Sequence, residues 1–524
     1  MTDILDQIVS RRREDIARFG YTMGANVPEK RNRAEPLPFP APLAEEKGVI
    51  LEIKRASPSK GDIAPSLDAA ETARQYAIAG TTAISVLTEQ HWFKGGLDDL
   101  QAACLAVDEY AKENKSQPVA ILRKDFLLAP EEIEIAYRCG ADAVLLIARI
   151  LSAEEMTAMV QCCQGLGMTA FIELRKNEDL QKLSVVAKKV GTSNIVCGVN
   201  ARDLQDFSID LLTPAGLLSE IKAIAGRDMR CVFESGIRTP EAANFAGSLG
   251  FTAMLLGEAA ARNPAEAKSL VSAFKNASLT PNAKAWLSYA KKLRNESRRP
   301  FVKICGLTNM KDAEKAAALG ADFLGFIFWE KSPRRADEKT VREISKKIRE
   351  TFSGKEQGGK CPKLVGVIVD ADSEDGKTVR TLVEEGVLDF VQLHGCAEEF
   401  FSISKKSPES TVNLPHYAVV NIAEEKDIEK IDALRLLGQP RILIDAKAGL
   451  MPGGTGKRIA DALVEKVSHK TKLWLAGGIT AENAGLICKK FQPELIDVAS
   501  GVESEPGKKD HAKLEALFSE LDSQ

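Results

Sequence analysis

Short runs of consecutive apolar residues alternate with helical patterns along most of the chain. The first half contains eight such runs, at 49–54, 83–88, 119–122, 143–148, 169–174, 195–199, 230–234 and 252–256. Between them, apolar residues recur at helical spacing, and some helices end in glycine just before the next run, as at Gly140 and Gly167. Nearly continuous apolar runs are typical of parallel strands buried on both faces, and eight strands close a barrel. We therefore predict a (β/α)8 barrel, with an open doubly wound sheet as the alternative.

The same alternation restarts at Phe301 after a polar, helical stretch that ends in KKLRNESRR. Eight further runs follow, at 301–305, 323–328, 364–369, 390–393, 417–420, 441–445, 472–476 and 496–499. An amphipathic helix over 2–19 and a Pro-rich passage over 28–42 precede the first barrel. The predicted fold is α/β, with two fused (β/α)8 TIM barrels in tandem. We place the domains at 1–275 and 300–524, joined by a helical connector at 276–299.

Composition narrows the class of protein. A chain of 524 residues, 44% of them hydrophobic, supports two cores of domain size. The 71 basic and 74 acidic residues are interspersed, so we expect no nucleic-acid partner. No apolar run reaches the roughly 18 residues of a membrane span, and the N-terminal segment is charged, so we expect a cytoplasmic protein away from membranes. We also expect a monomer. Ten scattered cysteines and five histidines without a CxxC motif predict reduced thiols and no metal.

Charged residues gather where the strands of the first barrel end, which is where such barrels form their active sites. Glu52 and Lys54 lie two apart and share a face, which also fits a structural buried ion pair. The pattern recurs at later strand ends, in Lys124, Glu173, Asn200, Glu234, Ser235 and Gly236. A lysine and a carboxylate in a low-dielectric mouth can act as general acid and base. Gly236 and the Gly257–Glu258 turn follow strands seven and eight, which predicts a phosphorylated small-molecule substrate.

The second barrel offers a different acid–base pair. Cys305 ends its first strand, Asp445 ends its sixth, and glycine turns follow strands seven and eight. An inert buried cysteine is the alternative for Cys305. A thiol with an ordinary pKa of about 8.5 needs only a modest shift to act as a base, and a desolvated Asp445 can act as an acid. This pair predicts isomerisation of a sugar phosphate without a cofactor. The run at 453–457 is no P-loop, because Met451 and Arg458 occupy required positions.

The first half resembles indole-3-glycerol-phosphate synthase of tryptophan biosynthesis through ILEIKRASPSKG, AISVLTE, LRKDF, IELR, VNARDL, ESGI and LLGE. The resemblance implies Lys124 as general acid and Glu173 as general base, with Glu52, Lys54, Asn200 and Glu234 completing the charged mouth. It places Ser57 and Arg202 near the substrate carboxylate, and Ser235, Gly236, Gly257 and Glu258 around the substrate and its phosphate. It also implies a mobile loop at 57–61, an N-terminal helix that caps the mouth, and a cofactor-free ring closure with loss of CO2 and water. A Schiff-base role for Lys124 is the rival, against which the acid-rich strand ends argue.

The second half resembles phosphoribosylanthranilate isomerase through KICGLTN, GFIF, KSPR, QLHG, LIDA, GGTG, LAGGIT and SGVE. The resemblance implies Cys305 as general base and Asp445 as general acid in an Amadori rearrangement, with Arg334 on the anthranilate carboxylate. Gly477, Gly478, Ser500 and Gly501 would bind phosphate. Two departures from the family concern the packing of one helix at 457–461, where an aromatic Phe-Asp-Trp is usual, and one phosphate contact at Ala499. The two resemblances together imply a bifunctional enzyme. The alternatives are tandem aldolase and epimerase barrels, or one barrel decayed to a metabolite-binding module.

Overall fold

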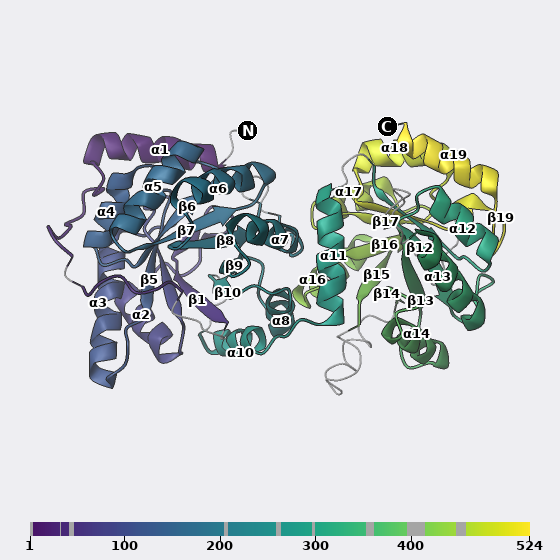
Figure 1. The fold of residues 1–524 in the computed structure, drawn as a ribbon, viewed down its shortest axis with the longest axis horizontal. Coiled ribbons are helices and arrows are strands. Elements are labelled where there is room, and N and C mark those ends of the chain that lie inside the picture. Colours follow the sequence, from purple (N-terminus) through teal and green to yellow (C-terminus); the bar gives the residue numbers. More distant parts are fainter. Residues whose placement is uncertain are drawn as a thin grey trace. The chain divides into compact units, whose positions relative to one another are not determined.

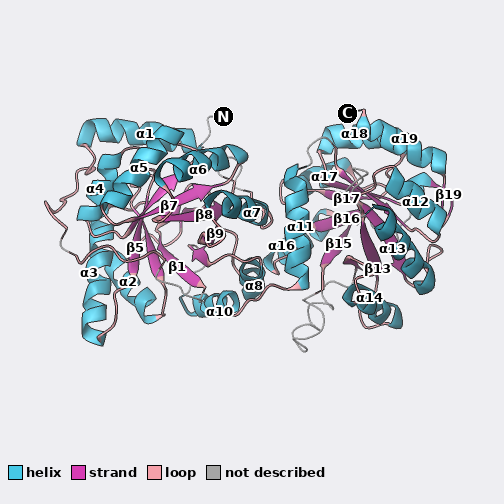
Figure 2. Ribbon diagram, in the orientation of Figure 1, coloured by secondary structure: helices cyan, strands magenta, loops and turns pink. Residues whose placement is uncertain are grey.

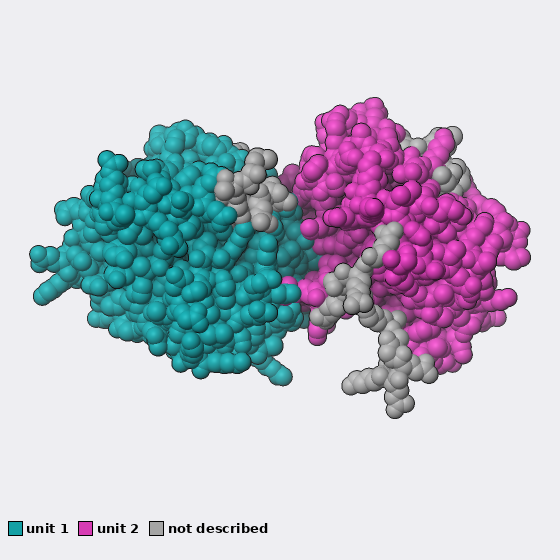
Figure 3. Space-filling view, turned by 90° about the horizontal axis from the view of Figure 1, so that it is seen from above, with its two compact units in different colours: residues 1–279 teal, residues 280–524 magenta. Residues whose placement is uncertain are grey.

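The computed structural model describes residues 4–31, 33–40, 47–203, 208–257, 264–295, 299–352, 361–395, 414–446 and 457–523. The chain forms two compact units, Met1–Leu279 and Thr280–Gln524 (Figure 3). In each unit the strands lie at the centre and the helices surround them (Figure 2). No helix of the described ranges is both long enough and apolar enough to cross a membrane.

The first unit is a closed barrel of parallel strands (Figure 1). Strand β1 pairs with both β4 and β10, which closes the sheet. The barrel strands are β1 (Gly48–Ile53), β4 (Ala83–Leu87), β5 (Ala120–Lys124), β6 (Ala143–Ile147), β7 (Thr169–Leu174), β8 (Ile195–Asn200), β9 (Cys231–Glu234) and β10 (Ala253–Leu256). The helices around it are α2 (Ala69–Ile78), α3 (Leu97–Asn114), α4 (Pro130–Arg138), α5 (Ala153–Gly165), α6 (Asn177–Val190), α7 (Thr213–Ala225), α8 (Pro240–Ser248) and α10 (Pro264–Lys275). The predicted barrel is confirmed, and the open sheet is excluded.

The N-terminal helix α1 (Ile4–Phe19) is fixed to the barrel through one buried arginine. Leu5 and Ile8 are buried on its apolar face. Arg12 lies 3.1 Å from Asp125, the residue after β5, and also pairs with Glu132 of α4. Because a buried guanidinium is stable only when it is paired, these contacts fix the position of α1 relative to the end of β5.

The second unit is also a closed parallel barrel, in which β11 pairs with both β12 and β18. Its strands are β11 (Phe301–Cys305), β12 (Phe323–Phe328), β13 (Lys363–Ile368), β14 (Phe390–His394), β15 (His416–Ile422), β16 (Ile442–Ala446), β17 (Trp474–Ala476) and β18 (Leu495–Val498). Its helices are α12 (Met310–Ala318), α13 (Glu338–Phe352), α14 (Glu374–Glu384), α16 (Glu429–Leu436), α17 (Asp461–Ser468), α18 (Ala481–Phe491) and α19 (His511–Asp522), with 3-10 turns η1 (Glu425–Ile428) and η2 (Ser500–Val502). At the departure around 457–461, Ile459, Val464 and Val467 are buried, so aliphatic residues pack α17 in place of aromatic ones.

Helix α11 (Pro281–Asn295) covers the N-terminal end of the second barrel with aromatic residues. The Trp286 side chain is fully buried, and its ring centroid lies 5.5 Å from that of Phe390 and 6.1 Å from that of Trp474. The Tyr289 ring lies 5.4 Å from that of Phe301, and its hydroxyl donates to Glu494 at 2.9 Å. Phe301, Phe390 and Trp474 are the first residues of their strands, so α11 packs against the end of the barrel opposite the carboxyl ends of the strands. The helix falls in the range expected as a connector.

Two small hairpins follow strand ends and were not predicted. Strands β2 (Ala56–Ser57) and β3 (Gly61–Asp62) fold the Ser-Pro-Ser-Lys-Gly loop of the first barrel back on itself. Strands β19 (Glu503–Glu505) and β20 (Lys508–Lys509) follow η2 in the second barrel. Each brings residues of a loop to the carboxyl end of its own barrel.

Candidate active sites

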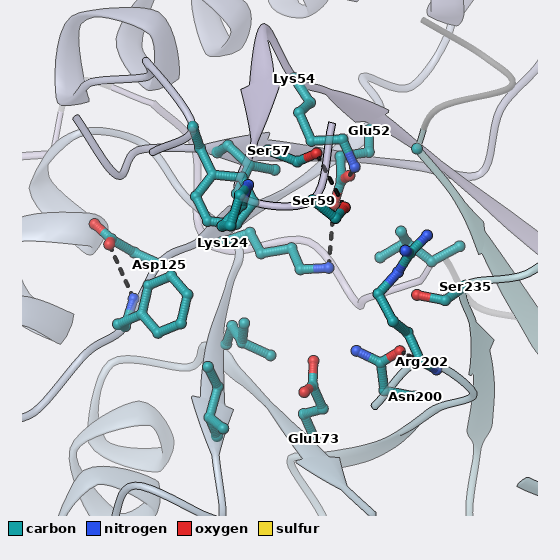
Figure 4. Close-up of a pocket in the computed structure, with 18 of the residues that line it drawn as sticks. Glu52, Lys54, Ser57, Ser59, Lys124, Asp125, Glu173, Asn200, Arg202 and Ser235 are labelled. Atoms are coloured by element: carbon teal, nitrogen blue, oxygen red, sulfur yellow. Dashed lines mark hydrogen bonds and ion pairs between the residues drawn. The ribbon is translucent and has the colours of Figure 1, made fainter. Parts of the chain in front are cut away.

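The first barrel has a pocket at the carboxyl ends of its strands, into which residues from several strands point (Figure 4). Ile4, Leu5 and Ile8 of α1 line one side, in agreement with the expected cap. The predicted residues that line the pocket are Glu52, Lys54, Ser57, Lys124, Glu173, Asn200, Arg202, Ser235, Gly236 and Gly257. Glu234 contacts Lys124 from the end of β9, whereas Glu258 lies outside the described residues. The structure thus brings together the predicted residues that it describes.

Lys124 is surrounded by carboxylates. Its Nζ lies 3.1 Å from Glu52 Oε2 and 3.4 Å from Glu234 Oε2, and Lys54 Nζ donates to Glu52 Oε1 at 2.5 Å. Burial disfavours the charged form of Glu52, but the charges of Lys124 and Lys54 outweigh it and lower its pKa to about 2. Burial also disfavours the charged form of Lys124, but the charges of Glu52, Glu234 and Glu173 outweigh burial and raise the pKa of the lysine. Glu52 and Lys124 therefore form a fixed ion pair.

The other two carboxyls hold protons more readily. Burial, followed by the charge of Glu173, raises the pKa of Glu234 to about 8. Burial also raises the pKa of Glu173, although Lys124 opposes the shift and the Asn200 side chain is hydrogen-bonded to the carboxyl. The pocket therefore combines a permanent cation with Glu234, whose protonation can change near neutral pH, and with Glu173, whose pKa burial raises. This combination suits general acid–base chemistry.

Two glycines make room for these carboxylates: Gly198, which was not predicted, and Gly257, which was predicted only as a phosphate-binding residue. A Cβ at Gly198, inside β8, would lie 2.1 Å from Glu234 Oε1, and one at Gly257 would lie 2.4 Å from Glu52 Oε1. The signal was a glycine within an apolar strand, which often marks a close approach of another group. The apolar wall of the pocket was also missed, and it includes Leu87, Phe93, Phe126, Leu145 and Ile147. Such a wall suits an aromatic ring.

The second barrel has a pocket lined by every residue predicted for its site. These are Cys305, Arg334, Asp445, Gly477, Gly478, Ser500 and Gly501. Burial raises the pKa of Asp445 to about 7, although its carboxylate accepts a hydrogen bond from the Ala446 N–H at 2.8 Å. Asp445 can therefore carry a proton near neutral pH, as an acid requires. Burial raises the pKa of the Cys305 thiol, and the charge of Lys303 opposes this shift. The role of Cys305 as a base stays a prediction.

The two glycine turns pack backbone against backbone. Gly477 and Gly478 adopt left-handed conformations with φ of 92° and 61°, which favour glycine. Asn483 fixes the turn, because its Nδ2 donates to the Gly478 carbonyl at 2.8 Å. A Cβ at Gly501 would lie 1.9 Å from the Ile479 carbonyl oxygen. The turns before α18 and within η2 therefore direct main-chain groups toward the pocket, as an anion site requires.

Arg334 is held by one carboxylate. Its Nε lies 3.0 Å from Glu503 Oε1 and its Nη2 lies 2.8 Å from Glu503 Oε2. Glu503 also accepts from Lys509 Nζ at 2.9 Å, and this lysine donates to the Cys305 carbonyl at 2.6 Å. The second hairpin thereby positions the arginine next to the strand that carries the cysteine.

Further polar residues of the second pocket were not predicted. Gln392, His394 and Asp497 line it beside Trp329, and Lys303 lies beneath them. Burial lowers the pKa of His394 to about 4, so its ring is neutral at physiological pH. In the described part of the chain, no three His, Cys, Asp or Glu side chains are grouped to bind a metal ion.

Two closed (β/α)8 barrels, each with an acid–base set and glycine turns at the carboxyl ends of its strands, define a tandem-barrel enzyme that acts on phosphorylated small molecules. The family model of indole-3-glycerol phosphate synthase matches residues 5–272, and that of N-(5'-phosphoribosyl)anthranilate isomerase matches residues 302–520. The chain belongs to the family of bifunctional tryptophan-biosynthesis enzymes in which the synthase, a lyase, precedes the isomerase.

Relatives of known name match almost the whole chain. The tryptophan biosynthesis protein TrpCF of Vibrio parahaemolyticus is 32% identical over 91% of this chain and 85% of its own length. The multifunctional tryptophan biosynthesis protein of Schizosaccharomyces pombe is 33% identical over 98% of this chain, which spans 66% of that protein's length. A solved structure of phosphoribosyl anthranilate isomerase from Thermotoga maritima is 30% identical, covers 43% of this chain and 100% of its own, and has a TM-score of 0.35.

Proposed function

We propose that the two units catalyse consecutive reactions. The second unit would convert N-(5-phosphoribosyl)anthranilate to 1-(2-carboxyphenylamino)-1-deoxyribulose 5-phosphate, and the first would close the indole ring of that product to give indole-3-glycerol phosphate. The observation that carries the proposal is the presence of a complete acid–base set in each pocket, with Lys124 among three carboxyls in one and Cys305 with Asp445 in the other. The isomerase product is the synthase substrate, which gives the fusion a chemical purpose.

In the isomerase, Asp445 would donate its proton to the furanose oxygen. The C1′–O bond then breaks with its electron pair on oxygen, and the nitrogen lone pair forms a C1′=N bond. Cys305 as thiolate takes the proton from C2′, and the released electron pair forms the enolamine that tautomerises to the ketone. The raised pKa of Asp445 supports the acid role, because the group carries a proton near pH 7.

In the synthase, Lys124 would protonate the C2′ carbonyl oxygen while the ring carbon that carries the carboxylate attacks C2′. Loss of CO2 returns its bonding electron pair to the ring. Glu173 takes the proton from C1′ and passes it to the C2′ hydroxyl, which leaves as water, while the C–H electron pair forms the C1′=C2′ double bond of the pyrrole ring. Solvent then returns a proton to Lys124. Glu52 and Glu234 hold the Lys124 ammonium in position, and the apolar wall of the pocket suits the anthranilate ring.

The remaining residues would bind substrate. Arg334, oriented by Glu503, would pair with the anthranilate carboxylate in the isomerase, and Ser57 with Arg202 would do so in the synthase. Main-chain groups at Gly236 and Gly257 would bind phosphate in the first barrel, and those at 477–478 and 500–501 in the second.

We assign synthase activity to the first unit and isomerase activity to the second, with α11 included in the second. Each described pocket is lined by residues of its own unit, which supports a monomer. The net charge of −3 is close to zero, which supports a cytoplasmic protein that binds neither nucleic acid nor membranes. Light scattering of the purified chain tests the monomer.

Variants of the full chain, assayed separately for each reaction, test the assignment. Cys305→Ala and Asp445→Ala should each lower isomerase turnover by about 100-fold or more and leave synthase turnover on supplied intermediate unchanged. Lys124→Ala should have the reverse effect. Cys488→Ala removes another buried cysteine of the second unit and serves as the matched control. Equal loss of both activities in any one of these active-site variants would contradict two separate sites.

A further inference from the structure

Lys303 is a buried cation with no role in the reaction proposed above. It lies in β11 two residues before Cys305, so both side chains share one face of the strand. Its side chain is fully buried, and a buried ammonium is stable only if it is paired and hydrogen-bonded. A lysine in the interior of a barrel, directly below the proposed base, therefore requires an explanation.

Two strong acceptors hold the ammonium. Lys303 Nζ lies 2.6 Å from Asp497 Oδ2 and 2.7 Å from Gln392 Oε1. Asp497 is the register partner of Lys303 on the neighbouring strand β18, and Gln392 also accepts from the Tyr417 hydroxyl at 2.9 Å. Side chains from β14, β15 and β18 thus fix the charge of Lys303 in one place.

The lysine and the cysteine pack over the same glycine. A Cβ on Gly325, the register partner of Cys305 on β12, would lie 2.8 Å from Cys305 Sγ and 3.0 Å from Lys303 Cε. The thiol and the lysine stem therefore lie side by side, in space that any other residue at this position would fill. The charge of Lys303 is the main influence that opposes burial and favours the thiolate.

The other end of the ion pair faces the acid. Asp497 and Asp445 both line the pocket, and Asp497 Oδ1 is buried without a hydrogen-bond partner among the described residues. After burial, the charge of Asp497 is the main influence that raises the pKa of Asp445, and it outweighs the opposing charge of Lys303. One ion pair thus presents its positive end to the thiol and its negative end to the carboxylic acid.

We propose that Lys303 and Asp497 are positioning residues for the isomerase, and that their ion pair allows a thiolate and a carboxylic acid to coexist in one pocket. The inference rests on the roles proposed above for Cys305 and Asp445. The other charged or titratable groups that face them are Lys509 near the thiol, and Tyr417 and the neutral His394 near Lys303. The reaction needs opposite protonation states in its two catalytic groups before substrate turns over, and burial alone favours the neutral form of both.

The main test replaces both charges in the full chain, as Lys303→Met/Asp497→Leu. Apolar replacement of a buried ion pair usually preserves folding, whereas removal of one partner does not. We expect isomerase kcat to fall by about 10- to 1000-fold at neutral pH, and alkylation of Cys305 by iodoacetamide, followed by mass spectrometry of its peptide, to require higher pH. Synthase turnover should not change. An isomerase kcat within twofold of wild type, or an unchanged alkylation profile, would overturn the proposal.

Asp497→Asn provides the second measurement, because its amide oxygen can still accept the hydrogen bond from Lys303 while the negative charge is removed. Alkylation of Cys305 should then occur at lower pH, and the alkaline limb of the isomerase pH profile, which reports the loss of the Asp445 proton, should also move to lower pH. A purely structural role would shift neither the pH dependence of Cys305 alkylation nor the alkaline limb of the isomerase profile. That result would refute the proposal even if the double variant failed to fold. Cys305→Ala separates the two hypotheses, since retained activity in that variant contradicts the base role itself.

Discussion

Replacing Trp286 by alanine should destabilise the second barrel and leave the first unchanged. The Trp286 ring is fully buried and contacts the rings of Tyr289, Phe390 and Trp474. Truncation of a buried tryptophan costs about 3–5 kcal/mol, a large part of the roughly 5–15 kcal/mol that stabilises a domain. With a urea dependence of about 3 kcal/mol per M, the unfolding midpoint should fall by about 1–1.7 M.

The two activities of one chain give the assay its internal control. Isomerase and synthase turnover are measured in the same urea series, and only the isomerase transition should move. Trp286→Phe should fall between wild type and alanine, because it keeps ring contacts and removes an indole N–H that has no partner among the described residues. Leu486→Ala, at a side chain that is 73% exposed in the same unit, should leave the midpoint unchanged. An unmoved midpoint for Trp286→Ala would refute the reasoning.

Two further predictions concern the pockets. Burial raises the pKa of Asp445 from 3.8 to about 7, so the folded chain binds more protons than the unfolded chain in this range, and the stability contributed is full below pH 4 and lost as pH rises through 7. The free energy of unfolding of Asp445→Asn relative to wild type should therefore grow by up to about 4 kcal/mol between pH 4 and 8, and a constant difference in urea melts would contradict this. Gly198→Ala should lower synthase turnover about tenfold or more and cost about 1–3 kcal/mol, because its Cβ would lie 2.1 Å from Glu234 Oε1 and 2.6 Å from Phe171 Cζ. Gly165→Ala is the control, because Gly165 lies in a helix with open space around it, and this change should leave stability unchanged or raise it slightly. Equal synthase rates in the two variants would disprove the close approach of Glu234 to Gly198.

The barrels could be predicted because their strands are buried on both faces. Each of the sixteen apolar runs is a strand within two residues of its expected bounds, as Phe301–Cys305 shows. The hairpins at 56–62 and 503–509 were missed because strands of two or three residues are too short to show an apolar pattern. The packing of α11 could not be predicted either, because an amphipathic helix does not specify which of two barrels it covers.

The predicted site residues lie at strand ends, where barrel topology alone brings them together. Several of the residues that were missed lie inside the strands. Lys303 occurs within FVKIC and Asp497 within LIDV. Because they are 194 residues apart, the sequence around one does not indicate that the other is its partner. Gly198 and Gly325 were missed for the same reason, because the group that occupies the space above each glycine comes from a different strand. These residues are identified by the pairing register of neighbouring strands and not by a sequence motif.

The pairing of first and last strands has a consequence for the order of events on the ribosome. The first barrel closes when β10 reaches β1, so all of its strands are available once residue 256 has emerged. Because domains fold as units during synthesis, this barrel can fold and bind its substrate while the second is still being translated. The second barrel cannot close before β18, which ends at Val498, has emerged and pairs with β11. The enzyme of the later step should thus become active before the enzyme that supplies it, and newly made chains should draw intermediate from older ones.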